Sequence, residues 1–68
     1  MQYRAEVYET ETEELVASLG DWESLQTAQR VCVDFQPMPL SWVQPWEEQW
    51  QARSNVYWYR VIAVAARG

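Results

Sequence analysis

The stretch Gln49–Ala66, QWQARSNVYWYRVIAVAA, decides the fold of this 68-residue chain. It is dense in aromatic and β-branched residues, the types that are enriched in strands. One short turn signal, Ser54-Asn55, interrupts it. We therefore predict a β-hairpin that forms the middle of a small sheet.

Pairing this hairpin through a two-residue turn at 54–55 places Trp50 opposite Tyr59 and gives the hairpin two unequal faces. Successive side chains of a strand point to opposite sides. One face is apolar and is the natural seat for a helix: Trp50, Ala52, Tyr57, Tyr59, Val61 and Ala63. The second face is mixed: Gln49, Gln51, Arg53, Val56, Trp58, Arg60, Ile62 and Val64.

The N-terminal part predicts a first hairpin. Gln2–Glu9 alternates apolar and polar residues with the period of a half-buried strand. The polar residues 10–13 form the turn, and alternation resumes at Leu15. Gly20-Asp21 is expected to end this second strand.

A helix follows, because apolar residues recur in steps of three and four from Leu25 to Phe35. Ser24 is the preferred cap, with Asp21 as the alternative, since a short side-chain oxygen can accept a bond from a free amide of the first turn. Trp22 is expected to pack just before the helix. The prolines at 37 and 39 stop the helix, which makes Gln36–Pro39 a crossover loop.

Residues 40–53 allow two interpretations. Trp42, Trp46 and Trp50 are four apart, which would stripe one side of a helix. The alternative is a strand at 40–44, a turn at 45–48 and a strand at 49–53. We prefer strands, because the segment 56–64 needs strand neighbours. A four-residue turn then puts Trp42 opposite Gln51, on the second face.

These elements predict one α+β domain, residues 1–68, with an antiparallel sheet, one helix on one face, and the order ββαβββ. Five tryptophans are more than such a domain can easily bury. Some of them should therefore lie on a surface.

The composition argues against an enzyme. The chain has no His and no Lys, and Gly occurs only at positions 20 and 68. General-base, Schiff-base and Gly-rich phosphate-loop chemistry therefore lack their usual residues. Cys32 has the spacing of a core residue. We expect no catalytic residue, no metal site and no cofactor.

The net charge of −5, with five Arg as the only cations, disfavours nucleic-acid phosphates and anionic membranes as partners and suits a basic protein. A single cysteine excludes an internal disulfide, which favours a cytoplasmic, intracellular setting. No signal peptide is evident. The longest apolar run, Val61–Ala66, is far short of the ~20 residues of a membrane span.

The second face supplies the candidate partner-binding site. Trp, Tyr and Arg are enriched among interface hot spots, and the residues chosen are Trp42, Trp58, Arg60 and Ile62. The leading hypothesis is a non-enzymatic, acidic protein-binding module.

Two other hypotheses remain. One is a structural homo-oligomer. The other is an acidic nucleic-acid mimic, which requires one side to be lined by the acidic set Glu9, Glu11, Glu13, Glu14, Glu47 and Glu48.

The opening YRAEVYETETEELVASLG, followed by Trp22, Ser24 and a helix with Ala28, resembles small orphan accessory proteins of GC-rich actinobacteria and their phages. Those share a strand–turn–strand of the form Y-x-V-E-V-Y-D-T-x-T-G-E-L-V before a helix. The resemblance covers residues 3–31 and departs at Glu13, where the pattern has Gly. It implies no catalytic residue. It implies an accessory or phage-borne protein that binds and inhibits a host protein, as an inhibitor or adaptor.

Overall fold

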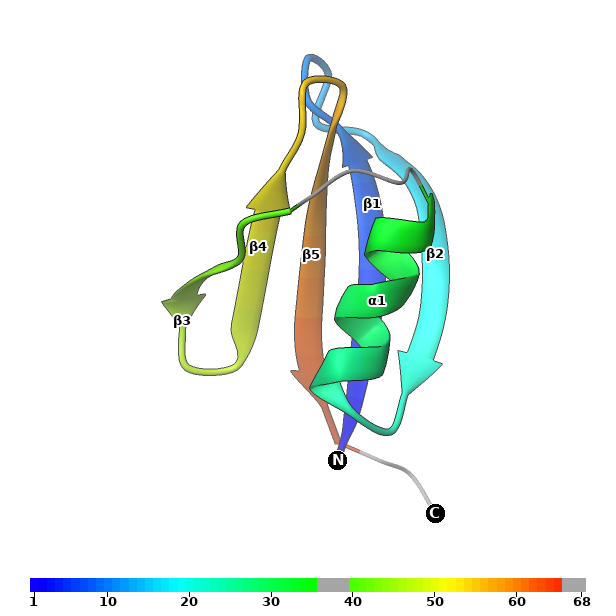
Figure 1. The fold of residues 1–68 in the computed structure, drawn as a ribbon, viewed down its shortest axis with the longest axis vertical. Coiled ribbons are helices and arrows are strands. Elements are labelled where there is room, and N and C mark those ends of the chain that lie inside the picture. The colour runs from blue at the N-terminus through cyan, green and yellow to red at the C-terminus, as the bar shows by residue number, and fades with distance from the viewer. Residues whose placement is uncertain (36–39, 66–68) are drawn as a thin grey trace.

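A five-stranded antiparallel sheet carries one helix on one of its faces (Figure 1). This computed structural model describes residues 1–35 and 40–65. Along the chain the elements are β1 (Gln2–Glu9), β2 (Leu15–Trp22), α1 (Leu25–Phe35), β3 (Val43–Trp46), β4 (Gln49–Arg53) and β5 (Tyr57–Val64). The sheet order is β2-β1-β5-β4-β3. The predicted α+β class and ββαβββ order are confirmed, and β5 is the middle strand.

The core lies between α1 and strands β1, β2 and β5. Its fully buried members come from alternate strand positions and one side of the helix: Ala5, Val7, Ala28, Cys32, Tyr59 and Val61. The predicted apolar seat for the helix is confirmed, because Ala52 is also buried and Trp50 and Tyr57 pack against this cluster.

The helix begins as its sequence predicts. The amide of Thr27 donates to the hydroxyl oxygen of Ser24 over 3.2 Å, which makes Ser24 the cap. Ala28 and Cys32 are its buried residues, one turn apart. The predicted crossover loop, Gln36–Pro39, lies outside the described residues.

Strand β2 runs further than predicted. The expectation that it ends at Gly20-Asp21 is wrong, because the strand continues to Trp22 through an irregularity in its pairing with β1. Gly20 makes this possible with a φ of 93°, a conformation that costs glycine little. The Trp22 indole N–H then donates to the Leu19 carbonyl over 2.9 Å, and its ring packs on the core.

Residues 43–53 form a hairpin, so the strand interpretation is confirmed and the helix interpretation is wrong. The predicted four-residue turn is also wrong, because β3 and β4 are joined by Glu47-Glu48 alone. β3 starts at Val43 and contains Pro45. Proline is tolerated there because β3 is an edge strand.

The β4–β5 pairing differs from the predicted register by two residues. Ser54 donates its amide to the Tyr57 carbonyl over 2.8 Å, so the turn is Asn55-Val56 and not Ser54-Asn55. Trp50 therefore lies opposite Val61. A shift by an even number leaves every side chain on its predicted face.

Candidate functional site

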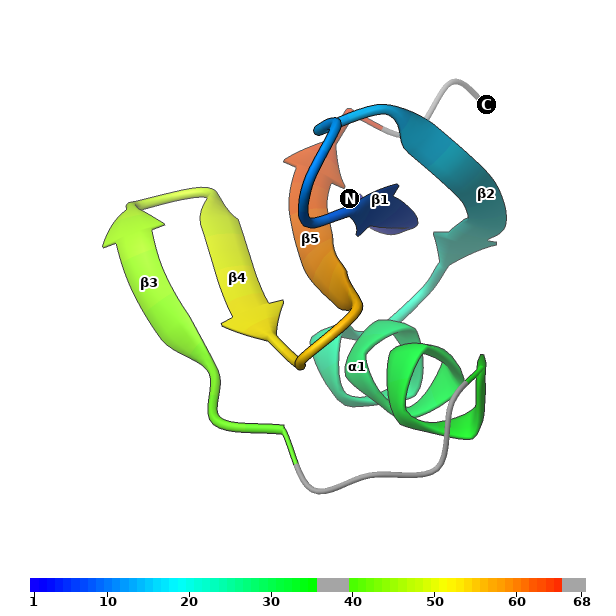
Figure 2. The same ribbon diagram turned by 90° about the horizontal axis from the view of Figure 1, so that it is seen from above.

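The face of the sheet opposite α1 is the candidate site, and we call it the open face. α1, the one helix in the described ranges, lies on the other side of the sheet (Figure 2). The registers of β1, β5 and β4 bring together on the open face Arg4, Glu6, Tyr8, Trp58, Arg60, Ile62, Gln49, Gln51 and Arg53. Three of the four predicted site residues, Trp58, Arg60 and Ile62, therefore lie on one face, each half-buried.

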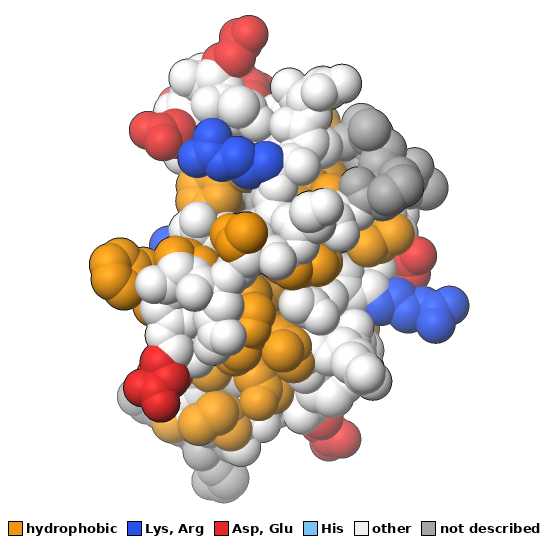
Figure 3. All heavy atoms as spheres, turned by 60° about the vertical axis from the view of Figure 1, so that its left-hand side comes forward, with side chains coloured by type: hydrophobic (Ala, Val, Ile, Leu, Met, Phe, Trp, Pro, Cys, Tyr) orange, Lys and Arg blue, Asp and Glu red, His pale blue; other side chains and the backbone are white. Residues whose placement is uncertain are grey.

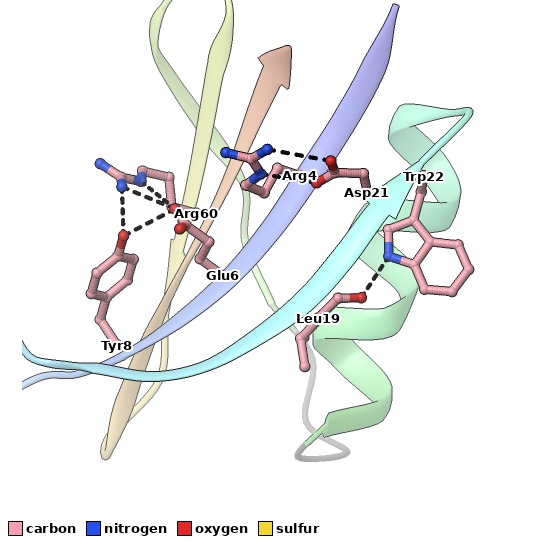
Figure 4. Close-up of polar contacts among 7 residues, drawn as sticks. All are labelled: Arg4, Glu6, Tyr8, Leu19, Asp21, Trp22 and Arg60. Atoms are coloured by element: carbon pink, nitrogen blue, oxygen red, sulfur yellow. Dashed lines mark hydrogen bonds and ion pairs between the residues drawn. The ribbon is translucent and has the colours of Figure 1, made fainter. Parts of the chain in front are cut away.

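A connected cluster of four side chains, Glu6, Tyr8, Trp58 and Arg60, lies on the neighbouring strands β1 and β5 of the open face. Figure 4 shows the polar contacts of Glu6, Tyr8 and Arg60. The rings of Tyr8 and Trp58 stack, with centroids 4.2 Å apart and 12° between their planes. Arg60 donates through Nη2 and Nε to Glu6 Oε1, at 2.9 Å and 3.2 Å. The Tyr8 hydroxyl donates to the same Glu6 oxygen over 3.0 Å and accepts from Arg60.

This cluster is joined by hydrogen bonds and stacking, and it is partly shielded from water. The Arg60 and Glu6 side chains are 30% and 15% exposed, so their attraction is less screened than that of a surface pair. Burial, and next the hydrogen bond to Glu6, raise the pKa of Tyr8 above its ordinary value. The phenol therefore stays neutral at pH 7, and the cluster holds one hydrogen-bonded arrangement.

A second ion pair lies beside this cluster, between Arg4 of β1 and Asp21 of β2 (Figure 4). Arg4 Nε and Asp21 Oδ1 are 2.9 Å apart, and both side chains are largely exposed. The hydrogen bond from Arg4 lowers the pKa of Asp21 below its ordinary value. The pair keeps both groups charged at the margin of the open face.

Trp42 does not lie with the other predicted site residues. It packs against the core cluster on the helix side of the sheet. The prediction assumed a four-residue turn. The pairing of β3 with β4 shifts by one residue between Trp46 and Val43, so Val43 takes the place opposite Gln51 instead. The expectation that Trp42 belongs to the second face is corrected accordingly.

The charge of the open face differs in sign from that of the chain. Of the four arginines that the structure describes, Arg4, Arg53 and Arg60 lie on this face, while Glu6 and Asp21 are its two acids. The chain as a whole carries −5. The open face therefore has a small positive excess on an acidic protein.

The predicted acidic set is split between two ends of the sheet. Glu9, Glu11, Glu13 and Glu14 lie at or beside the β1–β2 turn, whereas Glu47 and Glu48 form the β3–β4 turn at the opposite end (Figure 1). The single acidic side that a nucleic-acid mimic requires is not formed.

One polar atom of the cluster lacks a partner. The Trp58 indole nitrogen is buried and makes no hydrogen bond with the described residues. A buried donor without a partner costs about 1–3 kcal/mol. The stacked position of Trp58 is therefore held by its ring contacts and not by its N–H.

The thiol of Cys32 lies in the core. Burial raises the pKa of the Cys32 thiol to about 12, so it is protonated and inaccessible as a nucleophile. Within residues 1–35 and 40–65, no group of three or more His, Cys, Asp or Glu is placed to hold a metal ion. No helix in these ranges is long and apolar enough to span a membrane.

Two members of the cluster, Tyr8 and Glu6, were absent from the predicted site. A signal for both was present in the sequence. Tyr8 and Glu6 alternate with the buried Ala5 and Val7, which places both away from the core. What the sequence lacked was the register that sets Tyr8 opposite Trp58 and Glu6 opposite Arg60.

Comparisons with known proteins assign no family to this chain. No protein-family model matches it, and no similar curated protein or solved structure was found. The resemblance to actinobacterial and phage accessory proteins stays a prediction. The functional argument consequently rests on the open face itself.

Proposed function

We propose that this chain is a non-enzymatic protein-binding module whose partner docks on the open face. The observation that carries this proposal is the Tyr8–Trp58–Arg60–Glu6 cluster on strands β1 and β5 of that face. A sheet face without a helix over it is usually polar, whereas this one presents a stacked aromatic pair and, further along β5, Ile62.

The cluster has the chemistry of an interface centre. Trp, Tyr and Arg dominate binding hot spots because they supply a large apolar area and directed hydrogen bonds. Stacking and ion pairing already fix these side chains before any partner arrives. Immobilising a free side chain on binding costs about 0.5–1.5 kcal/mol. Side chains that are already fixed avoid much of this cost.

The local charge defines the kind of partner. Because the open face carries more Arg than acid, it favours a neutral or acidic contact surface. The net charge alone had favoured a basic partner. The proposal includes an intracellular setting and a role as an inhibitor or adaptor from a phage or mobile element. The first rests on the single cysteine, and the second on the sequence resemblance.

The experiment begins with capture of partners from the native host on the tagged protein and their identification by mass. The decisive step is the affinity of each purified partner for two variants. Trp58→Ala should weaken binding about tenfold or more, the size typical of a hot-spot truncation. Arg30→Ala, on the exposed side of α1, should leave it unchanged.

The result that contradicts the proposal is a folded Trp58→Ala protein that binds each partner as tightly as the parent. A loss of binding in Arg30→Ala instead would move the docking surface to the helix side.

A further inference from the structure

The edge strand β3 exposes two large hydrophobic side chains, Val43 and Trp46. All four of its residues are exposed, with Val43 at 59% and Trp46 at 68%. Hydrophobic side chains are spread over the side of the molecule that carries the β3–β4 hairpin (Figure 3). Trp46 lies opposite Gln49, so it projects on the side of the open face.

A hollow of about 270 Å³ lies at the other end of the same hairpin, where the chain leading into β3 parts from β4. Its lining is mainly apolar and comes from Ser41, Val43, Gln51, Ala52 and Arg53. An apolar cavity of about 150 Å³ admits benzene, so this hollow has room for one indole ring.

Arg53 lies at this hollow and has no counter-ion among the residues that the structure describes. It is exposed and makes no ion pair or hydrogen bond with the described residues, unlike Arg4 and Arg60. The carboxylates of Glu47 and Glu48 are similarly unpaired within the described ranges and directly follow Trp46. One end of the hairpin therefore carries the Trp46 ring next to Glu47, and the other end has the hollow next to Arg53.

These two ends complement each other. Val43 and Trp46 are three residues apart, or roughly 10 Å at about 3.3 Å per residue. Both lie on the same face of the hairpin, opposite Gln51 and Gln49. A two-fold axis through the middle of the hairpin brings the Trp46 end of one copy to the Arg53 end of the other. In such an isologous contact the Trp46 end of each copy meets the Arg53 end of the other, so the same contact forms twice.

We infer that the β3–β4 hairpin is a self-association surface, in which Trp46 of each copy enters the hollow of a second copy and Glu47 pairs with its Arg53. Burial of Trp46 and Val43 supplies most of the affinity, because an exposed ion pair contributes little. The Glu47–Arg53 pair fixes orientation and gives the association its salt dependence. This inference goes beyond the proposed function and does not depend on it.

Sedimentation of the full chain over a concentration series, at low and high salt, tests the inference. The parent should form a reversible dimer that weakens as salt is added. Trp46→Ala and Arg53→Glu should each raise the dissociation constant about tenfold or more. Arg53→Glu combined with Glu47→Arg keeps the parent's net charge of −5 and should restore the dimer.

Arg30→Glu is the matched control, because it changes the net charge as Arg53→Glu does but lies on the helix. It should dimerise like the parent. Should Arg53→Glu lose its circular dichroism spectrum, Arg53→Gln takes its place with the same expected direction. A parent that stays monomeric at every concentration overturns the inference. So does a dimer that is indifferent to Trp46→Ala, to Arg53→Glu or to the charge exchange.

Discussion

Tyr8 of β1 and Trp58 of β5 stack across neighbouring strands with their ring centroids 4.2 Å apart. The guanidinium carbon of Arg60 lies 5.1 Å from the Tyr8 ring centre, so a cation also contacts the pair. Stacked aromatic pairs contribute about 0.5–1.5 kcal/mol beyond the area they bury. The helix side of the sheet holds the core, and this pair gives the opposite side an ordered apolar centre of its own.

The unpartnered indole N–H of Trp58 leads to the first prediction. Trp58→Phe keeps an aromatic ring for Tyr8 and removes the buried donor, so the free energy of unfolding should change by less than about 1 kcal/mol. Trp58→Ala removes the ring as well and should cost about 2 kcal/mol. Urea denaturation of both variants measures the difference. Equal losses in the two would show that the stack contributes nothing.

The second prediction concerns the charge of Glu6. Glu6→Gln removes the carboxylate that accepts from both Arg60 and Tyr8, and should lower the free energy of unfolding by about 1–2 kcal/mol. The pKa of Tyr8 should fall, because Arg60 then acts on the phenol without the opposing carboxylate. Carbon-13 NMR of the Tyr8 ring over a pH series measures this pKa.

A matched change at the neighbouring pair is the control. Arg4→Gln breaks the more exposed contact with Asp21 and should destabilise less than Glu6→Gln. A Tyr8 pKa that is the same in the parent and in Glu6→Gln would contradict the proposed network.

The sequence identified the faces of the sheet but not the alignment of its strands. Alternation with period two placed Trp58, Arg60 and Ile62 on one face. A change of turn that shifts the register by two residues leaves this placement unchanged. It does not say whether the turn is at 54–55 or 55–56. That choice depends on Ser54, whose Oγ accepts from the Tyr57 amide at 3.1 Å and whose own amide donates to the Tyr57 carbonyl.

Trp42 shows where alternation was insufficient. Its face depended on an irregularity between Val43 and Trp46, where the β3–β4 pairing shifts by one residue and so moves Trp42 to the core side. Tyr8 shows the converse. Its outward position followed from alternation in β1, but its contact with Trp58 joins residues 50 positions apart and needs the β1–β5 register.

The β1–β2 turn gives the third prediction. Glu13 has a φ of 59°, in the region that glycine tolerates and other residues occupy at a cost of roughly 1–2 kcal/mol. Glu13→Gly relieves this strain, although glycine also gains freedom in the unfolded chain. The variant should be more stable by about 0.5–1 kcal/mol. It also restores the residue that the resembling pattern has at this position.

Thermal unfolding measures this gain. Glu11→Gly is the control, since Glu11 is exposed in the same turn and has no positive φ. It should be neutral or destabilising. A Glu13→Gly variant no more stable than the parent would contradict the account of this turn.

The buried thiol gives the fourth prediction, which concerns alkaline pH. Burial raises the pKa of Cys32 from 9.0 to about 12. Between these values the unfolded chain loses the thiol proton while the folded chain keeps it, so stability falls as pH rises above 9. One thiol contributes a slope of at most about 1.4 kcal/mol per pH unit. The raised pKa values of Tyr8 and Tyr59 act in the same direction above pH 10.

Urea denaturation of the parent and of Cys32→Ala at a series of pH values up to 10 isolates the thiol, because both proteins keep the same tyrosines. Cys32→Ala should be less stable than the parent at neutral pH, since it leaves a small void. Its stability should change less between pH 9 and 10. Equal slopes in the two proteins would contradict the burial of Cys32.

NMR mapping of the complex with a captured partner tests the central claim most directly. Indole and guanidinium N–H signals report on Trp58, Arg60 and Arg53 of the open face and on Arg30 of the helix in one spectrum. The account predicts that the partner shifts or broadens the signals of Trp58 and Arg60 and leaves Arg30 unchanged. Changes confined to Arg30 and the α1 amides, with Trp58 and Arg60 unmoved, would contradict it.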